Sequence, residues 1–408
     1  MIKKKYLILG AGPAGLTLAN MLLDRGEEDF LLLEKEDVAG GLCRTEYVGS
    51  NPVDIGGGHI LDVRSQRVCD YMFRFLPKDK WNIFDRDSKI RFQDQFMGSP
   101  FESHIWQLPV EDQVRYIKSI AIAGCNLGTP KPEKFVDWIR WKLGDEIAEN
   151  YMLPYNRKMF TSNLDSLGTY WLEKLPDVSF EDTLMSCLEH RFYGKHPGHA
   201  RFYYPDREGY GDAFILMQKR LGDKFLGGVR VTSLDVENRV VNEEFTADHI
   251  ISTIPWTDIE EYKGLEDEYI SMIGRLKYSG IQVDYHKQPL PFETKAHWIY
   301  YPQECYAFHR ILVLFNFSPR SEGYWTETNL ERVDMTGSPD IKSGPGADLS
   351  YKNIYAYPHN TLDKPEIMAK LLPRMEKSRI TGLGRWGEWQ HYNSDVVMEK
   401  AMDLAQKL

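Results

Sequence analysis

The segment Tyr6-Leu-Ile-Leu9-Gly10-Ala-Gly-Pro-Ala-Gly15 joins an apolar run to a turn in which glycine recurs at positions 10, 12 and 15. The next apolar run ends at Glu34, nineteen residues beyond Gly15. This pattern predicts a strand, a tight turn, the start of a helix and a second strand, an arrangement typical of dinucleotide binding. Because a helix N-terminus stabilises negative charge, a pyrophosphate is expected to contact Gly10, Gly12, Pro13, Ala14 and Gly15. The Glu34 carboxylate is expected to bind a ribose hydroxyl.

The residues after Glu34 indicate which dinucleotide is bound. The stretch Lys35-Glu-Asp-Val-Ala-Gly-Gly-Leu-Cys-Arg-Thr45 contains a second glycine pair and then an arginine. It resembles the corresponding stretch of amine-oxidase-type FAD proteins, in which the paired glycines pass close to the cofactor and the arginine meets its pyrophosphate. The resemblance implies FAD, with contacts from Lys35, Gly41, Leu42 and Arg44.

The composition is typical of a soluble enzyme. The 408 residues can form two or three domains, and the net charge of −10 argues against nucleic acid or an anionic membrane as a partner. No apolar run is long enough to cross a bilayer, so no membrane insertion is expected. The five cysteines lack a repeated spacing, which favours free thiols and a cytoplasmic location. Histidines and cysteines also lack metal-ligand spacing, so no metal site is expected.

Hydrophobic periodicity predicts that the FAD-binding domain is discontinuous. Its expected parts are residues 1–80, 200–260 and 359–408, and the apolar run over 247–255 is expected to return as a parallel strand of the same sheet.

Two further domains are expected between these parts. Apolar residues at helical spacing predict a small inserted bundle over 106–192. Aromatic and β-branched residues predict an antiparallel sheet, forming a substrate domain, over 81–105 and 261–358. Within it, residues 320–350 indicate a loop. The expected fold class is therefore α/β, a Rossmann-like FAD-binding domain with an inserted helical bundle and an antiparallel β-sheet lobe.

Several more motifs, in collinear order, resemble those of the UDP-galactopyranose mutases. They are Gly56-Gly-Gly-His-Ile60, Pro154-Tyr-Asn-Arg-Lys-Met-Phe160, Arg201-Phe-Tyr-Tyr-Pro-Asp-Arg-Glu-Gly-Tyr210, Trp298-Ile-Tyr-Tyr-Pro302 with Phe308-His-Arg310, and Ala356-Tyr-Pro358 with Gly384-Arg-Trp-Gly-Glu-Trp-Gln-His-Tyr392. Because the resemblance covers nearly the whole chain, it is more specific than any single motif.

The resemblance implies an isomerase that interconverts the pyranose and furanose forms of a sugar attached to a nucleoside diphosphate. In this family FAD must be reduced, and its N5 attacks the anomeric carbon and displaces the nucleoside diphosphate. The sugar then recloses through a different hydroxyl, and no net electrons are transferred. NAD(P)H is a candidate reductant, and a homodimer is compatible with the family.

The same resemblance implies roles for individual residues. The expected catalytic residues are His59, which would lie against the flavin, and Arg201 and Arg310, which would bind the diphosphate. Further cofactor contacts are implied for Gly57, Gly58, Val231, Arg385, Asn393 and Asp395. Besides the two arginines, the implied substrate contacts are Phe101, Glu102, Tyr155, Asn156, Phe160, Tyr300, Tyr357, His391 and Tyr392.

Three of these positions depart from the family pattern. Phe160 stands where relatives often have tryptophan, Glu102 where longer relatives have glutamine, and His391 where tyrosine is common. We therefore predict that UDP-galactopyranose is not the best substrate, with UDP-N-acetylgalactosamine and GDP- or dTDP-linked hexoses or heptoses as alternatives. Outside the family, the alternative is an FAD-dependent oxidoreductase of the amine oxidase or desaturase type, which shares the N-terminal fingerprint but lacks the two diphosphate arginines.

Overall fold

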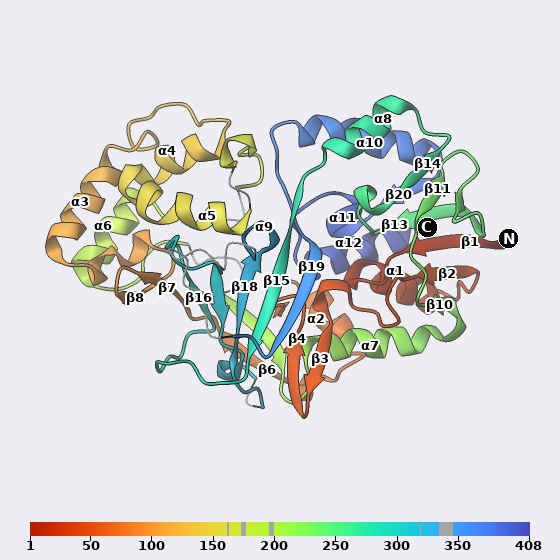
Figure 1. The fold of residues 1–408 in the computed structure, drawn as a ribbon, viewed down its shortest axis with the longest axis horizontal. Helices are drawn as coiled ribbons and strands as arrows, with labels where there is room; N and C mark the ends of the chain where they lie inside the picture. Colours follow the sequence, from red (N-terminus) through yellow and green to blue (C-terminus); the bar gives the residue numbers. More distant parts are fainter. Residues whose placement is uncertain (161–162, 173–176, 196–199, 319, 334–345) are drawn as a thin grey trace.

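The computed structural model describes residues 1–160, 163–172, 177–195, 200–318, 320–333 and 346–408. Figure 1 shows a helical lobe, a lobe that holds both chain termini, and the strands of a second sheet between them.

An eight-stranded sheet forms the core of the lobe with the termini. Its order is β10-β2-β1-β13-β12-β11-β14, and β20 also pairs with β13. The central pairs are parallel: β1 with β2 and β13, β10 with β2, and β20 with β13. The strands are β1 (Ile2–Leu9), β2 (Phe30–Leu33), β10 (Phe225–Leu226), β11 (Ser233–Asp235), β12 (Val240–Val241), β13 (Phe245–Ser252), β14 (Glu261–Lys263) and β20 (Ile380–Gly382).

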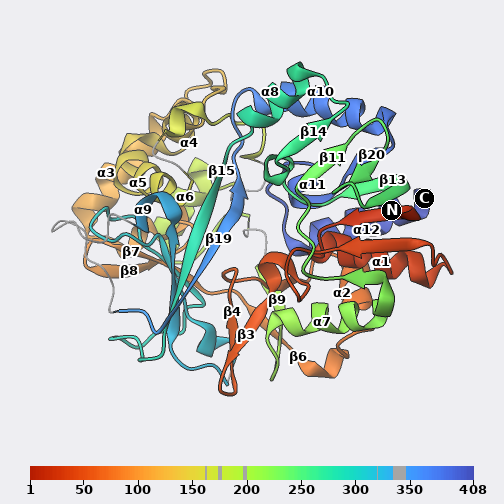
Figure 2. The ribbon, with the colours of Figure 1, turned by 45° about the vertical axis from the view of Figure 1, so that its right-hand side comes forward.

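Helices cover both faces of this sheet, which explains why the second half of β1, Tyr6–Leu9, is apolar without alternation. Tyr6 and Ile8 belong to one hydrophobic core, and Leu7 and Leu9 belong to another. Successive strand residues point to opposite faces, so both faces must be buried. The first core includes residues of α1 (Pro13–Asp24), α2 (Gln66–Met72), α7 (Tyr210–Leu221) and α12 (Ser394–Lys407), and the second those of α8 (Asp267–Arg275) and α10 (Lys364–Lys377). Figure 2 shows α8 and α10 on one side of the sheet and α1 and α7 on the other.

The second sheet has seven strands in the order β19-β15-β18-β17-β16-β7-β8. Its neighbours are antiparallel except for β16 and β7, which run parallel. The strands are β7 (Ser88–Phe92), β8 (Gln95–Gly98), β15 (Tyr278–His286), β16 (Trp298–Tyr300), β17 (Arg310–Leu312), β18 (Tyr324–Asn329) and β19 (Leu349–Pro358). Two smaller sheets pair β3 (Thr45–Val48) with β4 (Asn51–Asp54), and β9 (Arg201–Pro205) with β5 (Leu61–Asp62) and β6 (Trp81–Asp85).

The helical lobe contains α3 (Val110–Ala121), α4 (Phe135–Ile147), α5 (Leu153–Met159) and α6 (Phe180–Glu189). Gly144 interrupts α4 with a φ of 74°, and a Cβ there would lie 2.5 Å from the carbonyl oxygen of Ser119 in α3. Only glycine therefore permits this close contact between the two helices. The shorter helices are α9 (Leu330–Val333) and α11 (Gly384–Gly387). Within the described ranges, no helix combines the length and apolarity that a membrane crossing needs.

The structure differs from the sequence prediction over residues 320–350. Strand β18 occupies Tyr324–Asn329 in the middle of the second sheet, and each of its residues is buried. The prediction was wrong here because threonine, glutamate and asparagine resemble loop residues, whereas their polar groups lie inside the molecule. In the remainder of that stretch, Leu330–Val333 form α9 and residues 349–350 begin β19, whereas residues 334–345 lie outside the described residues.

Two predicted domain boundaries also lie elsewhere in the observed sheets. β14 belongs to the first sheet and α8 packs on it, so the second sheet resumes only at Tyr278 instead of residue 261. β6 pairs with β9 and not with the second sheet, which begins at Ser88. Both shifts arise because short strands such as β14 and β6 carry no signal of the sheet they will join.

Candidate functional site

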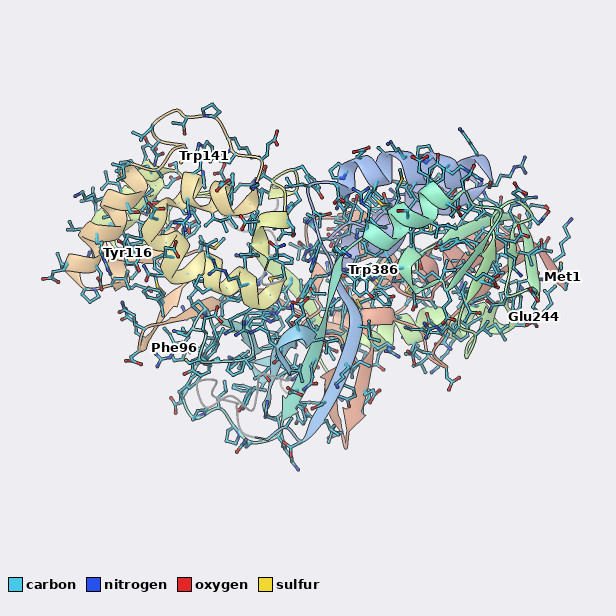
Figure 3. The ribbon with its side chains drawn as sticks, turned by 45° about the horizontal axis from the view of Figure 1, so that its top comes forward. Met1, Phe96, Tyr116, Trp141, Glu244 and Trp386 are labelled. Atoms are coloured by element: carbon cyan, nitrogen blue, oxygen red, sulfur yellow. The ribbon has the colours of Figure 1, made fainter. Side chains whose placement is uncertain are left out.

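A cavity of about 560 Å³ runs from the glycine turn after β1 to the second sheet. Trp386, which is labelled in Figure 3, contributes to its wall between the two lobes. Most residues expected to hold the cofactor line this cavity: Gly10, Gly12, Pro13, Ala14, Glu34, Lys35, Gly41, Leu42, Arg44, Gly58, His59, Val231, Arg385, Asn393 and Asp395.

The glycine turn is shaped to bring main chain to the cavity. A Cβ on Gly15 would lie 2.0 Å from the carbonyl oxygen of Gly10, so the first turn of α1 packs directly on the turn that precedes it. Gly12, by contrast, has open space where a Cβ would be, and it lines the cavity. The N-terminus of α1, at Pro13 and Ala14, therefore faces a space that suits a pyrophosphate.

Glu34 lies at the end of β2 and is held by backbone amides. Its Oε2 accepts a hydrogen bond from Ala11 N at 2.7 Å, and its Oε1 accepts one from Glu36 N at 3.2 Å. Burial raises the pKa of the Glu34 carboxyl, although both hydrogen bonds oppose this shift. The fixed carboxylate at the cavity wall fits the predicted ribose contact.

The second glycine pair packs against the first turn. Gly41 has a φ of 55°, and a Cβ on it would lie 3.2 Å from the Cα of Gly12. Nearby, Arg44 donates from Nε to Gly41 O at 3.1 Å, and its Nη1 lies 3.5 Å from Glu36 Oε2. The two glycine segments thus form one continuous wall of the cavity.

The loop from Gly56 to His59 forms the wall at the other end. Gly57 has a φ of 93°, and a Cβ on it would approach Glu327 Oε1 to 2.8 Å. His59 Nδ1 lies 3.0 Å from the Gly57 carbonyl oxygen, so this nitrogen is the donor and Nε2 is left as an acceptor. Burial lowers the pKa of His59 to about 4, so the ring is neutral at pH 7.

Arg385 completes this wall from the C-terminal part of the chain. Its guanidinium donates to the carbonyl oxygens of Tyr392 and Ala356. Its Nε is buried and has no hydrogen-bond partner among the described residues, and burial lowers its pKa to about 10. An uncompensated cation with a free donor fits an electron-rich ring system such as a flavin, so the residues present fit FAD.

At the second sheet, Arg310 is paired with a fully buried carboxylate. Its Nη2 donates to Glu327 Oε2 at 2.7 Å and to Tyr357 Oη at 3.2 Å. Burial alone would lower the pKa of Arg310, but Glu327 holds it well above its ordinary value. Its Nε is buried and also lacks a hydrogen-bond partner in the part of the chain that the structure describes. Of the predicted substrate contacts, Arg310, Tyr357, His391 and Tyr392 line the cavity.

Arg201 lies elsewhere than the sequence predicted. Its side chain is 58% exposed, it forms an ion pair with Asp85 at 3.0 Å, and it does not line the cavity. Arg201 begins β9, which pairs with β6, so the strand pairing directs it to Asp85. Among the described residues, the Arg201 side chain forms its ion pair with Asp85 and not with a residue that lines the cavity.

Several predicted substrate residues lie behind the cavity wall. Phe160 contacts Tyr357 and His391, with ring centroids 6.0 and 6.2 Å apart, and Tyr155 contacts Tyr300 at 5.4 Å. The residues of the predicted set that do not themselves line the cavity are Gly15, Gly57, Phe101, Glu102, Tyr155, Asn156, Phe160, Arg201 and Tyr300.

Phe101 and Glu102 lie inside the helical lobe. The Phe101 ring is fully buried and stacks on Tyr151 at 5.5 Å. Glu102 is also buried, and burial raises its pKa to about 7. Asn156 donates to Met152 O within the helical lobe. The family resemblance implied substrate contacts for Phe101, Glu102 and Asn156, whereas in this structure none of the three lines the cavity.

The sequence prediction did not include Arg86 and Glu327. Arg86 lines the cavity, and its Nη2 donates to Tyr300 Oη at 2.7 Å. Glu327 lies in the strand that was expected to be a loop. Neither residue belongs to a recognisable motif, so only the folded arrangement identifies them.

Comparison with known proteins extends the resemblance over the whole chain. Residues 13–297 match the family model described as flavin containing amine oxidoreductase. The chain is 20% identical to the dTDP-fucopyranose mutase of Escherichia coli, over 98% of this chain and 97% of that protein. The crystal structure of reduced UDP-galactopyranose mutase matches with a TM-score of 0.88 at 23% identity, over 100% of this chain and 94% of that one. A CLA-producing fatty acid isomerase from P. acnes matches less well, with a TM-score of 0.67 at 15% identity over 99% and 98% of the two chains.

Proposed function

The chain belongs to the flavin-containing amine oxidoreductase family, and from that premise we propose that it is an FAD-dependent mutase. It would interconvert the pyranose and furanose forms of a sugar attached to a nucleoside diphosphate. The likeness to dTDP-fucopyranose mutase along nearly the full length of both chains supports this reaction over others in the family.

The observation that carries the proposal is the charge at the substrate end of the cavity. Arg86, Arg310 and Arg385 line it together with the neutral His59. A guanidinium binds phosphate oxygens with directed, charge-assisted hydrogen bonds. The same cations would repel the ammonium group of an amine substrate. The charge therefore favours an anionic substrate and argues against an amine oxidase.

When bound and reduced, FAD would supply the nucleophile, N5, for the anomeric carbon of the sugar. It would be held by the glycine turn, Glu34, Arg44 and Arg385. The protein's own task is to bind the nucleoside diphosphate as it leaves and to keep it beside the sugar. The free Nε of Arg310 is a donor suited to its oxygens, and Tyr357 Oη holds the guanidinium in place.

His59 would contribute as a neutral group. With Nδ1 donating to the Gly57 carbonyl, Nε2 can accept a hydrogen bond from a sugar hydroxyl. A neutral ring also adds no positive charge that would compete with Arg310 for the diphosphate. We assign His59 to sugar positioning and Arg310 to the diphosphate.

The sugar is proposed from a relative and from the predicted departures. Because the full-length relative is named for dTDP-fucopyranose, a dTDP-linked deoxyhexose is the first candidate, ahead of UDP-galactopyranose. This ranking agrees with the sequence prediction that UDP-galactopyranose is not the best substrate.

The test is turnover of a panel of nucleotide sugars by dithionite-reduced and by oxidised protein, with products separated by chromatography. We expect furanose product only from the reduced protein, without stoichiometric consumption of reductant, and a higher kcat/KM for dTDP-fucopyranose than for UDP-galactopyranose. Equal turnover in both redox states would refute the mutase mechanism. Release of hydrogen peroxide from an amine substrate, with no sugar product, would establish the oxidase alternative.

A further inference from the structure

We propose that Arg86 is a second diphosphate-binding group of this site, in the role that the sequence assigned to Arg201. The inference rests on the proposed function and names a residue outside the motifs that led to it. Its basis is the balance of charge at the substrate end of the cavity, together with the way Arg86 is held there.

The first step concerns charge. Arg310 is neutralised by Glu327, which lies 2.7 Å away and is fully buried. In contrast, no carboxylate of the described residues lies within 4.0 Å of the Arg86 guanidinium, which bonds only to hydroxyl oxygens: Nη2 to Tyr300 and Nε to Ser88 Oγ at 2.9 Å. A leaving diphosphate carries more than one negative charge. Arg385, the other cation without a carboxylate partner at this end, is assigned to the flavin, so Arg86 is a cation that can supply the positive charge that the Arg310–Glu327 pair alone lacks.

The second step concerns position. Tyr300 in β16 lies directly opposite Arg310 in β17, and opposed residues of an antiparallel pair share one face of the sheet. The hydroxyl that binds Arg86 thus belongs to the same surface as Arg310. Both guanidinium groups line one cavity, so one diphosphate can meet both.

The third step concerns rigidity. The Arg86 guanidinium lies 4.4 Å from the centre of the Trp298 ring, a cation–π arrangement that fixes its plane. Its backbone N donates to Ala200 O at 2.8 Å, and the following residue, Asp87, donates to His297 Nδ1 at 3.1 Å. Because the Arg86 guanidinium is already held in place, it loses little conformational freedom when it binds a phosphate, which favours phosphate binding.

The experiment measures binding and needs no turnover. Calorimetric titrations of dTDP and UDP into the oxidised, FAD-loaded protein compare wild type with Arg86→Gln and Arg86→Lys. The matched control is Arg91→Gln, which removes an arginine of the neighbouring strand that bonds to Asp94 and does not line the cavity. Retained FAD and an unchanged circular dichroism spectrum establish that each variant is folded.

We expect Arg86→Gln to raise the Kd of whichever nucleoside diphosphate binds more tightly by at least about tenfold, because a charge-assisted hydrogen bond is lost. The slope of log affinity against log salt should also become shallower, since one cation fewer takes part. Arg86→Lys should keep the slope but bind more weakly than wild type, and Arg91→Gln should match wild type. An Arg86→Gln protein with wild-type affinity and slope would overturn the inference while leaving the mutase proposal in place. A wild-type protein that binds neither diphosphate would overturn both.

Discussion

The two ends of the cavity are built in different ways. At the cofactor end, much of the wall is main chain: Gly10 and Gly12 of the glycine turn, Gly41 of the second pair, and the N-terminus of α1. At the substrate end, the wall consists of long side chains from different strands, such as Arg310 from β17 and Tyr357 from β19.

The difference shows which part of such a site is free to vary. A wall of main chain suits a pyrophosphate, the part of the cofactor that does not vary. It tolerates few substitutions because the backbone can approach the pyrophosphate closely only where the residue is glycine. A wall of side chains can change its charge and shape without changing the fold. Substrate choice therefore belongs to the second end, and the predictions below separate the two ends, beginning with the largest expected effect.

At the cofactor end, Gly12→Asp should abolish FAD binding. The new side chain meets open space in the protein itself, so the fold survives, but its carboxylate lies where the pyrophosphate should bind. The flavin absorbance of the purified variant measures the loss. Gly274→Asp is the matched control, since a Cβ there also meets nothing within 4 Å and Gly274 lies outside the cavity. A yellow Gly12→Asp protein with full FAD content would contradict the assignment of this wall.

At the substrate end, Glu327→Gln should lower the free energy of unfolding by about 3–5 kcal/mol. It leaves the buried Arg310 guanidinium without its carboxylate, and an uncompensated buried charge is costly. Arg310→Gln should have a similar effect because it leaves the buried Glu327 carboxylate without its cation. The double variant should lose less free energy of unfolding than the two single variants lose in sum. Urea unfolding of the four proteins measures these differences. None of the three variants should turn over a nucleotide sugar at the wild-type rate. If the losses in the free energy of unfolding of the two single variants simply add in the double variant, the two residues are not a coupled pair.

Away from both ends of the cavity, the stability advantage of Glu102→Gln over wild type should grow as pH rises. Burial raises the pKa of Glu102 in the folded protein to about 7, above the unfolded value. The protonated carboxyl therefore stabilises the fold at low pH, and this contribution is lost as pH rises through 7. At pH 8 the glutamine variant should be more stable by about 1–3 kcal/mol.

Unfolding midpoints of wild type and Glu102→Gln between pH 5 and pH 8 test this expectation. Glu133→Gln, at an exposed position of the same lobe, should show no such trend. Because Glu102 lies behind the cavity wall, kcat/KM for a nucleotide sugar should be unchanged. A large fall in kcat/KM would restore the substrate contact that the sequence predicted.

The cofactor end of the cavity could be predicted from the sequence better than the substrate end. The α/β fold and the FAD-type wall were predictable and the fold is confirmed, because glycines, Glu34 and the apolar strands carry their meaning within a few neighbouring residues. Arg86 and Glu327 could not be predicted, since one follows a short strand and the other lies in a strand that resembles a loop. Arg201 shows the converse: its motif was present, yet the pairing of β9 with β6 directs it to Asp85. The roles of the individual site residues stay predictions.

The closing of the cofactor wall by Arg385 and the start of α12, far along the sequence from the glycine turn, has a consequence for synthesis on the ribosome. β1 lies between β2 and β13, β20 joins β13, and Arg385 and the start of α12 complete the cavity. The N-terminal strand, turn and helix leave the ribosome first but cannot form a finished site by themselves. Capture of FAD should therefore wait until residues 385–395 have been synthesised and folded. A nascent chain stalled with residue 384 still inside the exit tunnel should retain no flavin, whereas one extended beyond Leu408 by a linker should retain it.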